Sequence, residues 1–153
     1  MWYRKKKKEK SLLDKMGEKV KKAPDYKKKL DRIFSLYIRL RDSREFNFRY
    51  FRCISCGEIK PFDKGDNGHY FSRSKMSTRY NEYNCNIECS SCNRFKSDHL
   101  VGYRENLIKK IGQRNFDLLN WESARVKQWS DFELKELIRY YQAVNKKMLE
   151  EKG

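Results

Sequence analysis

Two Cys-x-x-Cys pairs decide the fold of this chain: Cys53-Ile-Ser-Cys56, followed at once by Gly57, and Cys89-Ser-Ser-Cys92. A two-residue gap lets both sulfurs of a pair face one ion, and four thiolates form the closed tetrahedral shell of a structural Zn²⁺. The 32 residues between the pairs are more than a simple zinc ribbon needs. We therefore expect one structural zinc ion that pins together the two ends of an inserted segment.

The redox environment bears on how these cysteines are interpreted. The first ten residues are polycationic and lack the apolar core of a secretory signal, and no run of 18 apolar residues could span a bilayer. We expect a cytoplasmic protein, and in that reducing compartment paired cysteines bind metal more often than they form disulfides or redox dithiols. The fifth cysteine, Cys85, has no apparent partner and is expected to be a small buried side chain.

The charge of the chain favours a polyanionic partner. Its 153 residues are enough for one domain with a modest core, and 37 Lys and Arg against 21 Asp and Glu give a formal net charge of +16. Nucleic acid is the commonest partner of such a chain, and an anionic membrane surface is the second. An aromatic content of 14% favours a packed core over a disordered basic tail.

The positive charge is densest at the N-terminus, where residues 1–29 hold 13 Lys and Arg and four acidic residues. Such a stretch is either a solvated, partly helical arm or a non-specific clamp on phosphates, and the two interpretations are compatible. We divide the chain into a basic arm, residues 1–26, and a folded domain, residues 27–153.

Hydrophobic periodicity and turn residues predict an α+β fold with a β-hairpin-like centre flanked by helices. Apolar residues recur at three- and four-residue steps over residues 30–38 and predict a helix over residues 25–42. The other predicted elements are a strand over 46–53, a strand over 59–62, a turn over 65–68, a strand end at 69–72, a loop over 75–83, a helix from Cys92 to Lys96, a helix over 100–111 that Gly112 ends, a short helix over 116–126, and a last helix that a Ser130 capping box begins and that ends near residue 150.

The two histidines of the chain both lie near the cysteine pairs. Phosphodiester hydrolysis needs a base that activates water, a metal that stabilises negative charge, and a cation that grips phosphate. A neutral imidazole is the usual base near pH 7, and an amide side chain or a backbone carbonyl on its second nitrogen fixes the tautomer. His69 as the base with Asn84 as its partner fits this scheme.

Further polar side chains around the cysteine pairs could meet the other two requirements. Candidate ligands for Mg²⁺ or another divalent cation are Asp66, Asn93 and His99, and candidates for gripping phosphate are Arg73 and Lys96. Taken singly, each is more often a turn, helix-end or solvated residue than a functional one. Their placement between and beside the cysteine pairs favours the functional interpretation.

A longer motif carries a resemblance to a known family. The stretch Asp66-Asn-Gly-His-Tyr-Phe-Ser-Arg73, the stretch Asn84-Cys-Asn-Ile-Glu-Cys-Ser-Ser-Cys-Asn-Arg-Phe-Lys96 and the first cysteine pair resemble the zinc-containing HNH (His-Me finger) nucleases. More narrowly, they are similar to the bacteriophage NinG family, also called Rap. The likeness covers roughly residues 27–145, and the helices predicted around residues 30–42 and 103–112 support it.

The resemblance implies a zinc-stapled ββα-metal core, flanked by N- and C-terminal helices, that cuts branched DNA in phage recombination in the host cytoplasm. It implies that His69 is the general base and that Asn84, the middle residue of the HNH triplet, orients it. The third position of the triplet is either Asn93 or His99.

Two positions depart from the family pattern. Many HNH enzymes have an acidic metal ligand immediately before the histidine, where this chain has Gly68, and the nearest substitute is Asp66 in the predicted turn. Asn86 stands where the resemblance leads us to expect a histidine.

Three functions from different classes fit these features: a metal-dependent endonuclease acting on branched DNA, a zinc-stapled DNA-binding module without cleavage activity, and a zinc-linked protein adaptor. A pure binder needs neither His69 nor Asn84, and an adaptor predicts no salt-sensitive affinity for DNA. A homodimer would let a junction-cutting enzyme cut two strands. The Tyr140-Tyr141 pair in the last helix could form that interface, although core packing is the commoner role of such aromatics.

Overall fold

Helix α2, Tyr26–Ser43, opens the part of the chain that the computed structural model describes, residues 24–153. The predicted basic arm therefore lies almost wholly outside the described residues. Asp25 caps the helix, because its side chain accepts a hydrogen bond from the Lys28 backbone N–H at 2.9 Å. The helix predicted over residues 25–42 is confirmed.

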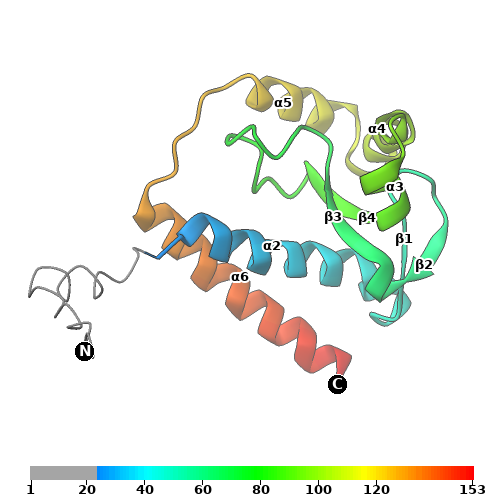
Figure 1. Cartoon of the computed structure of the whole chain (residues 1–153), viewed down its shortest axis with the longest axis horizontal. Coiled ribbons are helices and arrows are strands. Elements are labelled where there is room, and N and C mark those ends of the chain that lie inside the picture. Colours follow the sequence, from blue (N-terminus) through cyan, green and yellow to red (C-terminus); the bar gives the residue numbers. More distant parts are fainter. Residues whose placement is uncertain (1–23) are drawn as a thin grey trace, which may run out of the picture.

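Helix α6, Asp131–Lys152, packs along α2, as Figure 1 shows. It begins with the predicted capping box, in which Ser130 and Glu133 satisfy each other's backbone N–H groups. The two helices share the largest apolar core, which contains Leu30, Phe34, Tyr37 and Ile38 from α2 and Leu134, Ile138 and Tyr141 from α6. Tyr141 is buried, which confirms a core role for it, whereas Tyr140 is exposed.

Two small antiparallel sheets lie on the other side of α2. Strands β1, Tyr50–Arg52, and β2, Ile59–Pro61, form the first sheet. Strands β3, Gly65–His69, and β4, Cys85–Cys89, form the second, with register partners running from Gly65 and Cys89 to His69 and Cys85. Every residue of β4 is buried, and the loop over residues 70–84 joins the two strands.

The remaining helices follow β4 without a further strand. They are α3, Ser90–Phe95, α4, His99–Ile111, and α5, Gln113–Ser123. Gly112 ends α4 with a positive φ of 81°, as its position after the periodic segment predicts. Tyr103 and Leu107 of α4 pack with Phe116 and Leu119 of α5 and with Ile54 in a separate apolar core. No helix in residues 24–153 is long and apolar enough to cross a membrane.

One predicted strand, over residues 46–53, began too early, and the predicted turn over residues 65–68 was wrong. Residues 46–49 are not strand, because the end of α2 continues into a 3-10 helix, Arg44–Phe46, and the Phe48 N–H donates to the Ser43 carbonyl at 3.0 Å. Residues 65–68 are not a turn but most of strand β3. The glycines there serve packing, since a Cβ on Gly65 would overlap the Ile87 side chain of the neighbouring strand.

Candidate metal centre and adjoining cleft

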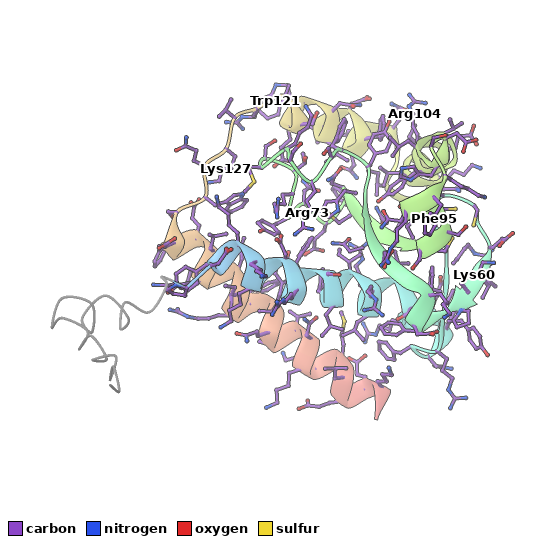
Figure 2. The ribbon with its side chains drawn as sticks, viewed as in Figure 1. Lys60, Arg73, Phe95, Arg104, Trp121 and Lys127 are labelled. Carbon is purple, nitrogen blue, oxygen red and sulfur yellow. The ribbon has the colours of Figure 1, made fainter. Side chains whose placement is uncertain are left out.

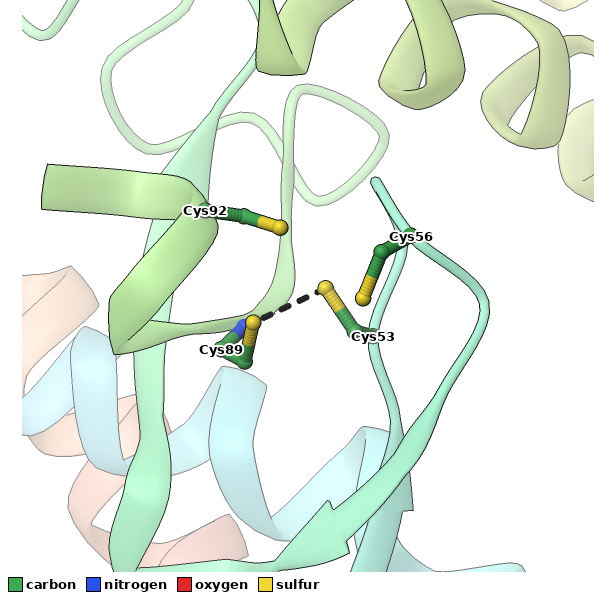
Figure 3. Close-up of side chains that lie close together, drawn as sticks. All are labelled: Cys53, Cys56, Cys89 and Cys92. Atoms are coloured by element: carbon green, nitrogen blue, oxygen red, sulfur yellow. Dashed lines mark hydrogen bonds between the residues drawn. The ribbon is translucent and has the colours of Figure 1, made fainter. Parts of the chain in front are cut away.

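The four cysteines of the two pairs meet at one point, as Figure 3 shows. Cys53 and Cys56 follow strand β1, Cys89 ends β4, and Cys92 lies in α3. Their sulfur atoms all lie within 4.8 Å of one another, and a tetrahedral shell with Zn–S bonds of about 2.3 Å needs sulfurs about 3.8 Å apart. The set of donors and its dimensions therefore fit one metal ion such as zinc.

Local backbone geometry turns the sulfurs inward. Gly57, with φ of 73°, lets its N–H fold back onto the Cys53 carbonyl at 2.9 Å. The Cys89 N–H donates to Cys53 Sγ at 3.3 Å, so the two pairs already contact each other through a hydrogen bond. Cys85 lies outside the cluster as a buried core residue, as expected.

Four of the predicted site residues line a cleft of about 540 Å³: His69, Arg73, Asn93 and His99. They come from β3, from the loop after it, from α3 and from the start of α4. Figure 2 shows Arg73 near the middle of the molecule, between that loop and α2, whereas Lys60 and Lys127 lie at its edges. The fold thus brings together side chains that are up to 30 residues apart in sequence.

His69, the last residue of β3, is held by a backbone carbonyl. Its Nε2 lies 3.2 Å from the Arg79 carbonyl oxygen. Because a carbonyl can only accept, this contact puts a proton on Nε2 and leaves Nδ1 as the unprotonated nitrogen of a neutral ring. Burial lowers the pKa of His69 below its ordinary value of 6.5, which favours that neutral ring at pH 7.

Asn84 is completely buried, and its side chain holds the loop rather than the imidazole. Its Oδ1 accepts from the Phe71 N–H at 2.7 Å, and its Nδ2 donates to the carbonyls of Phe71 at 3.0 Å and Thr78 at 3.1 Å. The Asn84 amide therefore makes no hydrogen bond with the His69 ring. Next to His69, the contact with Asn84 is a backbone one, in which the Tyr70 N–H donates to the Asn84 carbonyl at 2.9 Å.

An ion-pair cluster that the sequence did not predict lines the same cleft. Asp31 of α2 accepts from Arg79 Nε at 2.9 Å and from Arg79 Nη2 at 2.7 Å, and Arg73 and Tyr80 also donate to it. Burial favours the neutral carboxyl, but these hydrogen bonds outweigh it and lower the pKa of Asp31. Arg73 is the more exposed of the two arginines, so it is the one that an anion could recruit.

Asp66 and Lys96, like Asn84, do not line the cleft. Asp66 makes a bidentate ion pair with Arg94, at 2.8 Å for each contact, and accepts from Asn93 Nδ2 at 3.2 Å. Lys96, the residue just after α3, is exposed. Of the three predicted ligands of a divalent cation, the cleft thus contains Asn93 and His99.

His99, the first residue of α4, has a partner that sequence reasoning missed. Its Nδ1 lies 2.6 Å from Oε1 of Glu88, a fully buried carboxylate in β4. Gly102 lets α4 pack directly on the first cysteine pair, since a Cβ there would overlap the Ser55 carbonyl. The sequence offered one signal, an acidic residue directly before Cys89 of the second cysteine pair.

Comparison with known proteins assigns the family. The profile of the family described as "Bacteriophage Lambda NinG protein" matches residues 2–151. The chain belongs to the NinG family. Protein ninG of Escherichia phage lambda is 34% identical over 116 residues, which are 75% of this chain and 53% of that protein. Protein ninG of Salmonella phage P22 is 33% identical over 116 residues, again 75% of this chain and 53% of that protein.

The chain spans about half the length of the curated NinG proteins that it matches. Protein ninG of Escherichia phage 933W is similar to the same degree, at 33% identity over 75% of this chain and 54% of that protein. No solved structure matches the chain.

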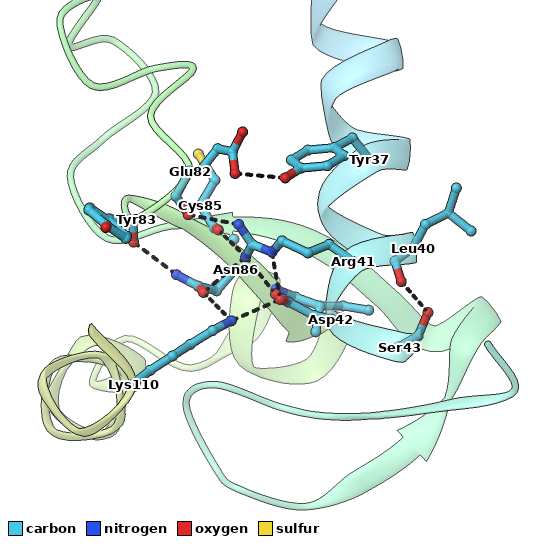
Figure 4. A network of polar contacts seen from close by, with 12 residues as sticks. Tyr37, Leu40, Arg41, Asp42, Ser43, Glu82, Tyr83, Cys85, Asn86 and Lys110 are labelled. Carbon is cyan, nitrogen blue, oxygen red and sulfur yellow. Dashed lines mark hydrogen bonds and ion pairs between the residues drawn. The ribbon is translucent and has the colours of Figure 1, made fainter. Parts of the chain in front are cut away.

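In this NinG-family chain, Asn86 belongs to a buried polar network on the side of β4 that faces α4, shown in Figure 4. Its Oδ1 accepts from Arg41 at 3.2 Å and from Lys110 at 2.7 Å, and its Nδ2 donates to the Tyr83 carbonyl at 3.0 Å. Asp42 bridges the same two cations. Asn86 therefore joins α2, β4 and α4, and it does not line the cleft.

Proposed function

We propose that this NinG-family protein is a metal-dependent endonuclease of the HNH (His-Me finger) type that hydrolyses phosphodiester bonds in branched DNA. The observation that carries the proposal is the convergence of His69, Arg73, Asn93 and His99 on one cleft. The succession of β3, β4 and α3 beside a four-cysteine cluster agrees with a ββα-metal arrangement. Branched DNA as the substrate rests on the resemblance of the motifs.

In this proposal the chain's own residues do most of the positioning. The neutral His69 ring takes a proton from water through Nδ1, while the Arg79 carbonyl holds the ring by its Nε2–H. Arg73 binds a phosphate oxygen of the substrate in place of Asp31, and Asp31 keeps its ion pair with Arg79. Asn93 and His99 would hold a divalent cation, which when bound stabilises the charge on the phosphate and on the leaving oxygen.

Zinc in the four-cysteine cluster has a structural role here. A shell of four thiolates leaves no open coordination position for water or phosphate. The cluster joins the end of β4 and the start of α3 to the segment after β1. It therefore holds β4, the strand that pairs with the His69 strand β3, and α3, the helix that precedes the His99 helix α4.

The test is nicking of a four-way junction by the purified, zinc-loaded full chain with Mg²⁺ or Mn²⁺. The matched variant is His69→Ala, with melting temperature and zinc content as controls for its fold. We expect the wild type to nick the junction and the variant to lose at least 100-fold in rate, the order of a general base. Equal cutting by both proteins would refute the assignment of the base.

The second candidate is a zinc-stapled DNA-binding module without cleavage activity, since a net charge of +16 suffices for binding by itself. Salt-sensitive junction binding with no cutting under either cation would favour it. A junction affinity that does not change with salt would instead favour a zinc-linked protein adaptor.

A further inference from the structure

Glu88 is a charged residue that neither the cysteine cluster nor the proposed base uses, although it directly precedes Cys89 and packs against Gly68. The side chain is fully buried in β4. Its Oε1 accepts from Ser55 Oγ at 2.5 Å and lies 2.6 Å from His99 Nδ1. Its Oε2 is buried and has no hydrogen-bond partner among residues 24–153. Burial of a carboxylate is costly, so a compensating positive charge is expected close to it.

The absence of a side chain at residue 68 makes room for this carboxylate. A Cβ on Gly68 would overlap both Oε2 and Cβ of Glu88. Gly68 directly precedes His69, and His69 lines the cleft. The Glu88 carboxylate of β4 therefore occupies space that a side chain on residue 68 would need.

The contact with Glu88 determines which nitrogen of His99 is free. A carboxylate only accepts, so the proton lies on Nδ1 and Nε2 keeps its lone pair. Nε2 has no hydrogen-bond partner in the described part of the chain, and His99 lines the cleft. A histidine that donates one ring N–H to a carboxylate and offers the other nitrogen is the usual arrangement of a metal-ligating histidine.

We propose that Glu88 is the positioning residue for His99, and that His99 Nε2 makes the cleft selective for a transition-metal divalent cation over Mg²⁺. Imidazole nitrogen suits the borderline transition metals, whereas Mg²⁺ binds oxygen ligands and keeps most of its waters. Besides the four cysteines, residues 24–153 contain no group of three acidic, His or Cys side chains that could hold an ion. An imidazole nitrogen in the cleft therefore has a large share in the choice of cation. The inference rests on the proposed function only for what this cation does in cutting.

The first experiment measures cation binding without DNA. Zinc-loaded full chain is titrated with Mn²⁺ and free Mn²⁺ is followed by electron paramagnetic resonance, alone and in competition with Mg²⁺. Mn²⁺ is the probe because it has little affinity for thiolates and leaves the zinc in place. We expect Mn²⁺ to bind more tightly than Mg²⁺, Glu88→Gln to weaken Mn²⁺ roughly 10- to 100-fold, and His99→Asn to lower the preference for Mn²⁺ over Mg²⁺ by about tenfold.

One control variant defines the outcomes. Ser55→Ala removes the other hydrogen bond to Glu88 Oε1. It should bind Mn²⁺ within about threefold of the wild type. A Ser55→Ala loss as large as that of Glu88→Gln, or unchanged Mn²⁺ binding in Glu88→Gln or His99→Asn, would overturn the proposal. Normal Mn²⁺ selectivity in a protein that never nicks DNA would reject the nuclease function alone.

A second measurement uses the wild-type protein, so it does not depend on whether a variant of the buried Glu88 folds. The chain has only two histidines, so ¹⁵N-histidine NMR of the wild type resolves both rings. We expect His99 to carry its proton on Nδ1, and substoichiometric Mn²⁺ to broaden its Nε2 signal. A proton on Nε2, or an Nε2 signal that Mn²⁺ leaves sharp, contradicts the assignment.

Discussion

At the scale of single residues, the site depends on which nitrogen of each imidazole is protonated. Both histidines are held by an oxygen acceptor, a backbone carbonyl for His69 and a carboxylate for His99. Neither acceptor could be assigned from the sequence, because Arg79 and Glu88 lie 10 and 11 residues away from the histidines that they hold. The residue types that line the cleft were predictable, but their hydrogen-bond partners depend on the register of β3 and β4 and on the path of the loop between them.

The lowered pKa of His69 predicts the acid side of a pH–rate profile. Burial lowers the pKa of the folded imidazole below the ordinary histidine value of 6.5. We therefore expect the single-turnover nicking rate to fall with a midpoint below pH 6.5, as the folded ring takes up its proton. The unfolded chain takes up that proton first, so the free energy of unfolding should begin to decrease below about pH 6.5. A midpoint at or above pH 6.5 would contradict the prediction.

The Asn86 network predicts a structural role at the position where a histidine was expected. Asn86→Ala removes the oxygen that accepts from Arg41 and Lys110 and the nitrogen that donates to the Tyr83 carbonyl. All three partners are partly or fully shielded from water. We expect the free energy of unfolding to fall by about 3 kcal/mol, measured by urea denaturation. The matched control is Asn120→Ala, an exposed asparagine on α5, which should change it by less than about 0.5 kcal/mol.

At the scale of elements, the helices were the part of the fold that sequence could predict. Periodic apolar residues and caps gave α2, α4 and α6 to within one or two residues. Strand β4 was missed because all of its residues are buried, including Asn86 and Glu88, so it shows no alternation. Strand β3 was mistaken for a turn because glycine and asparagine dominate it. Only the neighbouring residues Ile87 and Glu88, which leave no room for a Cβ, explain why glycine stands at positions 65 and 68.

The pairing of α2 with α6 predicts unequal roles for two adjacent tyrosines. Tyr141 packs edge-on against Phe34 at 4.9 Å between ring centres, and its hydroxyl donates to Glu82 at 3.0 Å. We expect Tyr141→Ala to lower the free energy of unfolding by about 4 kcal/mol, measured by urea denaturation. Tyr140→Ala, on the exposed side of α6, should cost less than about 1 kcal/mol, and equal losses would mean that α6 packs through a different face.

At the scale of the whole molecule, charge and chemistry are divided along the chain. Residues 1–24 hold ten Lys and Arg and three acidic residues, whereas the cleft and the cysteine cluster lie after residue 30. Deleting residues 1–24 should weaken DNA binding equally for all sequences and reduce the slope of log affinity against log salt, by about 0.9 for each lost phosphate contact. A fluorescence-anisotropy titration at several salt concentrations measures this. An unchanged slope would make the segment a solvated tail.

The two-stranded hairpin of β3 and β4 has a consequence for how this fold can vary. Fifteen residues separate its strands, too many for a tight turn to decide which residue pairs with which. The alignment is anchored instead at both ends, by the cysteine that closes β4 and by the buried amide of Asn84 that grips the loop. A slip of one position would turn His69 to the opposite face of the sheet. Because the two anchors, and not the length of the loop, set the alignment, insertions inside the loop should leave it unchanged as long as both anchors stay intact.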